Sequence, residues 1–332
     1  MEEDLLKRIV IDPNVMNGKP VIRGTCLTVQ CILKLMAYGS TIDEILHKYE
    51  ELTQEDIGAC IRFAAKATNL DFLLSGGVSM TEYIRDQKRV DKVLRKIGVV
   101  VVMGKDHAKK SEDVVNTVKA IYEAGLVAEV TFRIDESLLR EAMSELTKMR
   151  AESDPENPMV LGVGSVINPH ELETAIEMGF DMAVSPDSGM GGYREKVDFV
   201  KITRSAKVFG APAGFSPSEF SYWIEREDGF EPDAVKIFNS SVYGPKNLGG
   251  LLAPYQRDRH TGRIIMPTGG VDRKTGPEFQ KNIKKYGFFP VLGMSDPLSL
   301  VLEKKMPGDP DILRESLAKF KEEFTANIKS SA

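Results

Sequence analysis

Beyond residue 98 the chain alternates between two patterns of hydrophobic and polar positions. Short runs of apolar residues, many of them β-branched, are typical of parallel strands that are buried on both faces. Between these runs, apolar residues recur every three to four positions, as on one face of a helix, at residues 112–124, 136–149 and 171–178 among others. Eight strands are predicted, at residues 99–103, 128–132, 160–165, 182–185, 207–213, 234–238, 264–268 and 288–293.

The number of strand–helix units bears on the fold class. Eight such units within residues 98–332 favour a closed barrel over an open doubly wound sheet. A dinucleotide-binding sheet would carry a GxGxxG turn, and Gly162-Val163-Gly164 lacks the third glycine at the required distance. The predicted fold class of this part is therefore α/β, a (β/α)8 TIM barrel.

The first 75 residues follow a different rhythm. Residues 8–12 have the pattern of a short strand, and three helical patterns follow, two of which open with a capping box at Thr41 and Thr53. Ser75-Gly76-Gly77 has the composition of a linker, and residues 81–96 have the charged amphipathic pattern of one helix. The predicted domains are a small helical domain at residues 1–75, a linker with the first amphipathic helix at 76–97, and the barrel at 98–332.

The overall composition is that of a globular protein, with 42% hydrophobic and 28% charged residues among 332. No apolar run approaches the length of a membrane span, and the acidic start MEEDLLKR lacks the apolar region of a signal peptide. These features predict a cytoplasmic protein without a membrane partner. The net charge of −5 gives no general reason to expect a nucleic acid partner.

Cysteine and histidine usage argues against a metal site. The three cysteines, Cys26, Cys31 and Cys60, include no CxxC pair, and the four histidines are scattered along the chain. Free thiols buried in a reducing compartment are therefore predicted in preference to a zinc site. We expect no metal and no other cofactor.

Charged residues within two predicted strands are candidates for chemistry, because barrel enzymes carry their reactive groups at the C-terminal ends of strands. In the second strand Glu129, Thr131 and Arg133 alternate onto one side, which is costly in an apolar barrel unless the charges bind or catalyse. The alternative is a structural ion pair between Glu129 and Arg133.

The sixth strand holds a lysine, Lys236, among Ala, Val, Ile and Phe residues. Desolvation there should disfavour the ammonium form and leave a free amine that can attack a carbonyl carbon. The alternative is a lysine that extends from the strand end into water.

Glycine-rich turns follow the last two strands, at Thr268-Gly269-Gly270 and at Gly293-Met294-Ser295. Backbone N–H groups in such turns hold a phosphate in many barrels. A tight turn alone would also explain the glycines.

Together these segments resemble the family of 2-keto-3-deoxy-6-phosphogluconate (KDPG) aldolase and 4-hydroxy-2-oxoglutarate (KHG) aldolase. The resemblance covers about residues 82–300 and rests on the order of six short motifs. These are EVTFR at 129–133, GVGSV at 162–166, VSP at 184–186, PSE at 217–219, VKIF at 235–238 and TGGV at 268–271. The resemblance implies a cofactor-free lyase that releases pyruvate and an aldehyde from a hydroxylated 2-keto acid, and a homotrimer.

The same resemblance implies roles for single residues. Lys236 would form the Schiff base, Glu129 would transfer protons, and Arg133 would bind the substrate carboxylate. Gly269, Gly270 and Ser295 correspond to the phosphate-binding turns. Ser165 stands where the family usually has threonine. The remaining expected substrate contacts are Pro186, Phe238, Thr268 and Gly293.

Two features depart from the family pattern. Asn239 replaces a proline after the lysine strand, and the stretch before the seventh strand, residues 251–263, is longer than expected. Its Arg257, Arg259 and Arg263 are expected to lie near the far end of the substrate.

The N-terminal part resembles a helix-turn-helix-like family grouped with VapB-type antitoxins, on the sequence RIVIDPNVMNGKPVIRGT at residues 8–25 and LTQEDIGACIRFAA at 52–65. This resemblance implies a DNA or protein partner. Residues 1–75, however, hold eight Lys and Arg against eleven Asp and Glu, a poor footprint for phosphate contacts. A dimerisation or docking module is the alternative.

Three functions therefore stay open. The first is a Schiff-base aldolase, which uses Lys236, Glu129 and Arg133 together. The second is a regulator that senses a keto acid without turnover and needs neither the amine nor the proton shuttle. The third is another phosphate-binding barrel enzyme that shares only TGGV and needs no lysine on the sixth strand.

Overall fold

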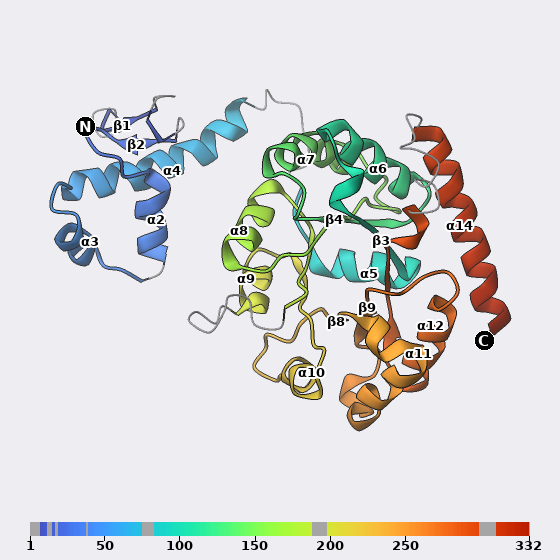
Figure 1. Ribbon diagram of the computed structural model, residues 1–332. Coiled ribbons are helices and arrows are strands. Elements are labelled where there is room, and N and C mark those ends of the chain that lie inside the picture. Colours follow the sequence, from blue (N-terminus) through green and yellow to red (C-terminus); the bar gives the residue numbers. More distant parts are fainter. Residues whose placement is uncertain are drawn as a thin grey trace. The chain divides into compact units, whose positions relative to one another are not determined.

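The computed structural model describes residues 7–11, 15–16, 19–37, 39–74, 83–187, 198–298 and 310–331, without the side chains of 65–74 and 329–331. The chain divides into two compact units, residues 1–80 and 81–332 (Figure 1). Ser75-Gly76-Gly77, the predicted linker, lies outside the described residues.

The N-terminal unit combines a short strand pair with three helices. Its elements are β1 (Ile9–Val10), β2 (Val21–Ile22), α2 (Val29–Ala37), α3 (Ile42–Lys48) and α4 (Gln54–Leu74). The strands pair antiparallel, with Ile9 opposite Ile22. The predicted capping box at Thr41 is confirmed, since Thr41 and Glu44 exchange hydrogen bonds at the start of α3. The prediction of buried thiols is wrong for Cys26, which is exposed because it lies in the turn after β2, while Cys60 on α4 is buried.

The second unit consists of parallel strands that alternate with helices. Its elements are α5 (Gln87–Ile97), β3 (Val99–Met103), η2 (Lys105–His107), α6 (Ser111–Glu123), β4 (Val127–Thr131), α7 (Glu136–Ala151), β5 (Leu161–Gly164), α8 (Pro169–Met178), β6 (Met182–Val184), α9 (Phe199–Ser205), β7 (Phe209–Ala211), α10 (Pro217–Ile224), β8 (Ala234–Ile237), α11 (Ser240–Leu252), η3 (Ala253–Tyr255), η4 (Asp258–His260), β9 (Ile264–Pro267), α12 (Gly276–Lys285), β10 (Phe289–Pro290), β11 (Leu292–Met294) and α14 (Pro310–Ser331). Each of the eight predicted strands overlaps an observed strand, and the eighth is divided at Val291 into β10 and β11.

The strands form two parallel sheets. One has the order β11-β3-β4-β5-β6-β7 and the other the order β10-β9-β8. Isolated parallel bridges join Ala213 to Lys236 and Thr268 to Gly293, next to the edges at which the two sheets meet. The unit is therefore a mixed α/β fold with a curled parallel sheet.

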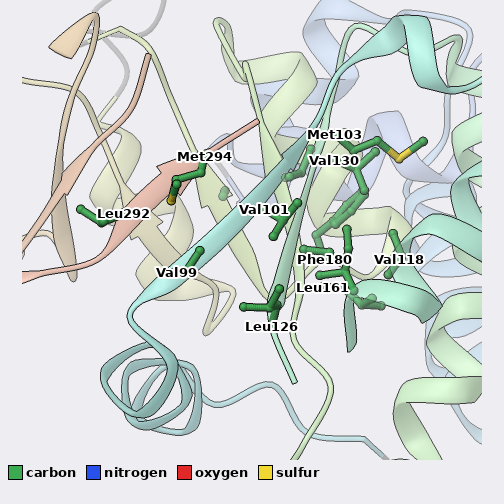
Figure 2. Packing of buried hydrophobic residues seen from close by; sticks show 14 of the residues in the cluster. Val99, Val101, Met103, Val118, Leu126, Val130, Leu161, Phe180, Leu292 and Met294 are labelled. Atoms are coloured by element: carbon green, nitrogen blue, oxygen red, sulfur yellow. The ribbon is translucent and has the colours of Figure 1, made fainter. Parts of the chain in front are cut away.

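The outer face of the curled sheet packs against the helices around it. Val99, Val101 and Met103, which alternate along β3, belong to a large buried cluster with Val118 of α6 (Figure 2). Because side chains alternate between the two faces of a strand, the intervening residues face the inside of the curl.

A second buried cluster fills the inside of the curl. It contains Val100 of β3, Val127 of β4 and Ala234 of β8, together with Val90 and Leu94 of α5. Residues two positions apart on a strand share a face of the sheet, so the residues two positions after this cluster's strand members also face the inside of the curl. Glu129 and Lys236 therefore lie on the same inner face as Val127 and Ala234.

The helix predicted at residues 81–96 starts later than expected. Helix α5 begins at Gln87, because Asp86 adopts an extended conformation and its side chain accepts a hydrogen bond from the N–H of Lys88. Residues 83–86 form no helix or strand, and the hydroxyl of Tyr83 donates to buried Asp181 at 2.6 Å. Thr81 lies outside the described residues.

Hydropathy along the helices bears on membrane insertion. Among the helices of the described ranges, none combines the length and the apolar character that crossing a bilayer requires.

Candidate active site

A lysine and a glutamate occupy the inner face of the curled sheet. Lys236 on β8 is 3% exposed and Glu129 on β4 is 2% exposed. The strands reach this face from different sheets, since Glu129 is in register with Gly162 of β5, and Lys236 is in register with Met266 of β9. The structure thus confirms that both side chains are buried, and excludes the alternative in which Lys236 extends into water.

The two charges perturb each other's ionisation. Burial lowers the pKa of Lys236, and the nearby Glu129 carboxylate partly opposes that effect. Burial also raises the pKa of Glu129, and Lys236 opposes that shift in turn. Both directions favour the uncharged forms, a free amine and a carboxylic acid. This combination suits an amine nucleophile beside a proton donor.

The carboxyl group of Glu129 has room because of a glycine on the neighbouring strand. A Cβ atom at Gly164 would lie 2.7 Å from Cδ of Glu129 and even closer to Oε1, so any other residue there would displace the side chain. The Oε2 atom of Glu129 is buried and has no hydrogen-bond partner within the described ranges. A buried carboxyl oxygen without a partner is available to a ligand that brings a donor.

An aromatic ring accompanies the lysine. The Nζ atom of Lys236 lies 5.0 Å from the ring centroid of Phe238, which follows β8 and is 40% exposed. The ring is therefore near the buried amine and is itself partly open to solvent.

Arg133 differs from its predicted placement. It lies beyond the end of β4 with 41% of its side chain exposed, and it pairs with Glu171 of α8 at 2.5 Å. Its Nη2 also donates to the carbonyl oxygen of Ser165 at 3.2 Å. The predicted alternation of Glu129 and Arg133 onto one buried face is wrong, because the strand ends at Thr131 and the chain turns there. The structural Glu129–Arg133 ion pair is excluded with it.

The loops after β5 and β6 carry two further predicted residues. Ser165 directly follows β5 with φ +60, a left-handed conformation that is uncommon for serine and turns its carbonyl toward Arg133. Pro186 follows β6 and is partly buried beside Ser185, whose side chain is fully buried.

The predicted phosphate-binding turns pack tightly against the loop that follows β8. A Cβ at Gly269 would lie 2.9 Å from Cγ of Asn239, and a Cβ at Gly270 would lie 3.1 Å from Cα of Ser241. Both glycines have positive φ, +81 and +72. The N–H groups of Gly269 and Gly270 donate no hydrogen bond inside the part of the chain that the structure describes.

The other predicted residues of this region lie at the ends of the last strands. Thr268 is buried and its N–H donates to the hydroxyl of Ser240 at 3.0 Å. Gly293 lies within β11 and faces Thr268, since a Cβ there would lie 3.1 Å from Cγ2 of Thr268. Ser295 is exposed directly after β11.

The arginines of residues 251–263 lie elsewhere than expected. Arg257 and Arg259 pair with Glu225, which follows α10. Arg263 precedes β9, whereas Gly269 follows that strand, so the two residues are at opposite ends of it. The expectation that these arginines lie near the phosphate-binding turns is therefore wrong for Arg263, and the other two are engaged with acidic side chains.

Two residues of the site escaped sequence reasoning. Gly164 was seen only as part of a motif, although its small size makes room for Glu129. The sequence does mark Glu171, because this glutamate stands three residues after Asn168 at the start of a helical pattern. The side chain of Asn168 caps α8 by accepting a hydrogen bond from the N–H of Glu171. That signal predicts a role at the helix start and not a contact with Arg133.

Within the described ranges, no group of three or more His, Cys, Asp or Glu side chains is placed to hold a metal ion.

Comparisons with known proteins add to this geometry. A search of curated proteins found no match. A solved structure titled "Native KDPGal structure" is 15% identical, covering 70% of this chain and 95% of its own, with a TM-score of 0.49. Tryptophan synthase subunit alpha from Legionella pneumophila str. Paris is 14% identical, covering 72% of this chain and 98% of its own, with a TM-score of 0.50. At this identity the likeness to tryptophan synthase shows the fold alone.

Family models match both units of the chain. One described as "Protein of unknown function (DUF433)" matches residues 9–64. Another, described as "KDPG and KHG aldolase", matches residues 90–286, which is more than half of the chain and includes Glu129, Arg133 and Lys236. The chain therefore belongs to the KDPG and KHG aldolase family.

Proposed function

We propose that this protein is a class I aldolase that cleaves a 2-keto-3-deoxy-6-phosphosugar acid, or 4-hydroxy-2-oxoglutarate, to pyruvate and an aldehyde through a Schiff base at Lys236. The observation that carries the proposal is the burial of Lys236 together with Glu129 on the inner face of the sheet. A lysine with a lowered pKa beside a carboxyl with a raised pKa is the pair that Schiff-base chemistry requires.

The reaction proceeds by electron withdrawal into nitrogen. The Lys236 amine attacks the C2 ketone of the substrate to give a carbinolamine. The Glu129 carboxylic acid protonates its oxygen, which leaves as water, so that an iminium and the Glu129 carboxylate are formed. The bond between C3 and C4 then breaks, and its electron pair forms an enamine with the iminium. Glu129 accepts the C4 hydroxyl proton as the aldehyde departs. Protonation at C3 and hydrolysis of the iminium release pyruvate and free Lys236.

Arg133 has a separate task in this scheme, which is to bind the keto-acid carboxylate. A guanidinium matches a carboxylate with two parallel hydrogen bonds. Ser165, Pro186, Phe238 and Thr268 complete the proposed surroundings of the pyruvyl part of the substrate, because each lies within two residues of the end of a strand of the curled sheet.

We further propose that the two sheets form one closed (β/α)8 barrel. The isolated bridges from Ala213 to Lys236 and from Thr268 to Gly293 support this, because they join the segments just after β7 and β9 to β8 and β11. The proposed site would then lie at the C-terminal ends of the strands, as in other barrel enzymes. A cytoplasmic location and a homotrimer complete the proposal. A DNA or protein partner of residues 1–75 stays a prediction, which their net charge does not favour for DNA.

The far end of the substrate is proposed to carry a phosphate. The N–H groups of Gly269 and Gly270, next to exposed Ser295, offer hydrogen-bond donors to a dianion. A phosphorylated substrate should therefore have a higher kcat/KM than 4-hydroxy-2-oxoglutarate.

Replacement of Gly270 by alanine tests the phosphate site. The added Cβ meets Ser241, so the loop must shift and its N–H groups move with it. We expect kcat/KM for the phosphorylated substrate to fall by about 10–100-fold, the loss of one charge-assisted hydrogen bond or more, and to fall less for 4-hydroxy-2-oxoglutarate. Gly262→Ala is the matched control, because Gly262 also has positive φ but no atom near its Cβ position. Equal losses for both substrates would mean that Gly270 only shapes the turn.

The assay that tests the proposed function is the release of pyruvate from each of the two substrates by the purified full chain. We expect release with at least one of them, at a rate that treatment with EDTA leaves unchanged, because the Schiff base and not a metal stabilises the carbanion. An activity that EDTA abolishes would contradict the class I mechanism.

A further inference from the structure

Arg133 already has a carboxylate beside it. Its Nη2 lies 2.5 Å from Oε1 of Glu171, and the same nitrogen donates to the carbonyl oxygen of Ser165 at 3.2 Å. The side chain of Glu171 is 13% exposed and that of Arg133 is 41% exposed, so the pair is shielded from water mainly on the side of the glutamate.

Because a guanidinium has the shape of a fork, its contact with Glu171 affects how a second carboxylate can bind. A carboxylate can bind arginine with two hydrogen bonds end-on, through Nη1 and Nη2, or side-on, through Nε and Nη2. Both arrangements bring a carboxylate oxygen to Nη2, where Oε1 of Glu171 lies. Two negatively charged oxygens on one nitrogen repel each other. A substrate carboxylate therefore binds Arg133 through two bonds either by displacing Glu171 from Nη2 or by taking the second N–H of Nη2, which now points to the Ser165 carbonyl, against the repulsion of Glu171.

The other oxygen of Glu171 is anchored independently of Arg133. Oε2 accepts a hydrogen bond from the N–H of Ile167 at 2.9 Å, and the Glu171 N–H donates to the side chain of Asn168. These contacts belong to the start of α8 and do not involve the guanidinium. They hold the side chain at the site while Oε1 is free to exchange places with another carboxylate oxygen.

We propose that Glu171 is a built-in competitor for the carboxylate of the substrate at Arg133, and so sets the affinity of the site for keto acids. This inference rests on the proposed function, in which Arg133 binds that carboxylate. It identifies Glu171 as a residue that determines affinity without touching the reacting atoms.

The test is Glu171→Gln, which keeps the shape of the side chain and an oxygen that accepts from Ile167, but removes the competing charge. Pyruvate binding is measured by calorimetry on the full chain carrying Lys236→Met, with and without Glu171→Gln, so that no Schiff base contributes. We expect pyruvate to bind about 3–10-fold more tightly when Glu171 is replaced, because a neutral acceptor competes less well than a charged one.

Two comparisons separate competition from a general effect of charge. Glu177→Gln removes the same charge from an exposed position of α8 and should leave pyruvate affinity unchanged. In chains that also carry Arg133→Lys, Glu171→Gln should give a smaller gain, because lysine has no fork for the two carboxylates to share.

The outcomes that overturn the inference are distinct from those that overturn the proposed function. Unchanged or weaker binding with Glu171→Gln would show that Glu171 does not compete, and absence of pyruvate binding with or without the replacement would show that Arg133 is not a carboxylate site. Neither result requires Lys236. The proposed function is contradicted instead if the chain with Lys236 intact forms no Schiff base, and this result does not depend on the effect of Glu171→Gln.

Discussion

Lys236→Arg is expected to reduce pyruvate release to background, a loss of roughly 10⁴-fold or more, as for the removal of other covalent nucleophiles. Arginine keeps the positive charge but is not deprotonated in proteins, so it cannot supply the free amine that attacks C2. Burial lowers the pKa of Lys236 and thereby favours the free amine in the wild-type chain. The measurement is kcat for pyruvate release under saturating substrate.

The matched control for this change is Lys246→Arg, which makes the same substitution at an exposed lysine of α11 and should leave kcat unchanged. Thermal unfolding shows whether the larger guanidinium is tolerated in the buried site. Retention of activity by a folded Lys236→Arg chain would end the Schiff-base account.

Glu129→Gln is expected to lower kcat by about 10²–10⁴-fold, the usual contribution of a general acid or base. The amide has nearly the same size, so the space that Gly164 leaves is still filled, but it cannot exchange a proton with the substrate. Because Lys236 remains, the variant should still form the Schiff base with pyruvate slowly. Loss of cleavage with retained Schiff-base formation is the signature that separates a proton-transfer residue from a structural one.

The control here is Glu112→Gln on the surface of α6, where the side chain is 64% exposed and no effect is expected. A Glu129→Gln chain that keeps near wild-type kcat but unfolds at a much lower temperature would show that Glu129 only stabilises the buried lysine.

Much of the second unit was predictable, because strands buried on both faces appear in the sequence as continuous apolar runs. The prediction of 99–103 coincides with β3, and the others differ by a few residues at their ends. The lowered pKa of Lys236 was predictable for the same reason. A lysine within such a run has either to reach water or to become less basic, and Lys236 stays buried in β8.

The contacts at the strand ends were not predictable in this way. Alternation assigns a face only while the strand continues, and β4 ends two residues before Arg133, so its partner became Glu171 from the next helix. The predicted start of the helix at residue 81 is wrong for a related reason. The periodicity of residues 81–96 continues through Tyr83, but the hydrogen bond from Tyr83 to Asp181 links positions 98 residues apart. Such long-range contacts leave no periodic signal.

The Schiff base itself provides the most direct test of the account. Borohydride reduces an iminium to a stable amine, so treatment of the full chain with pyruvate and borohydride, followed by peptide mass spectrometry, locates the reacting nitrogen. The account predicts one reduced pyruvate adduct, on the peptide that contains Lys236, and none on any other lysine. An unmodified Lys236 peptide, or an adduct on a different lysine, would contradict it.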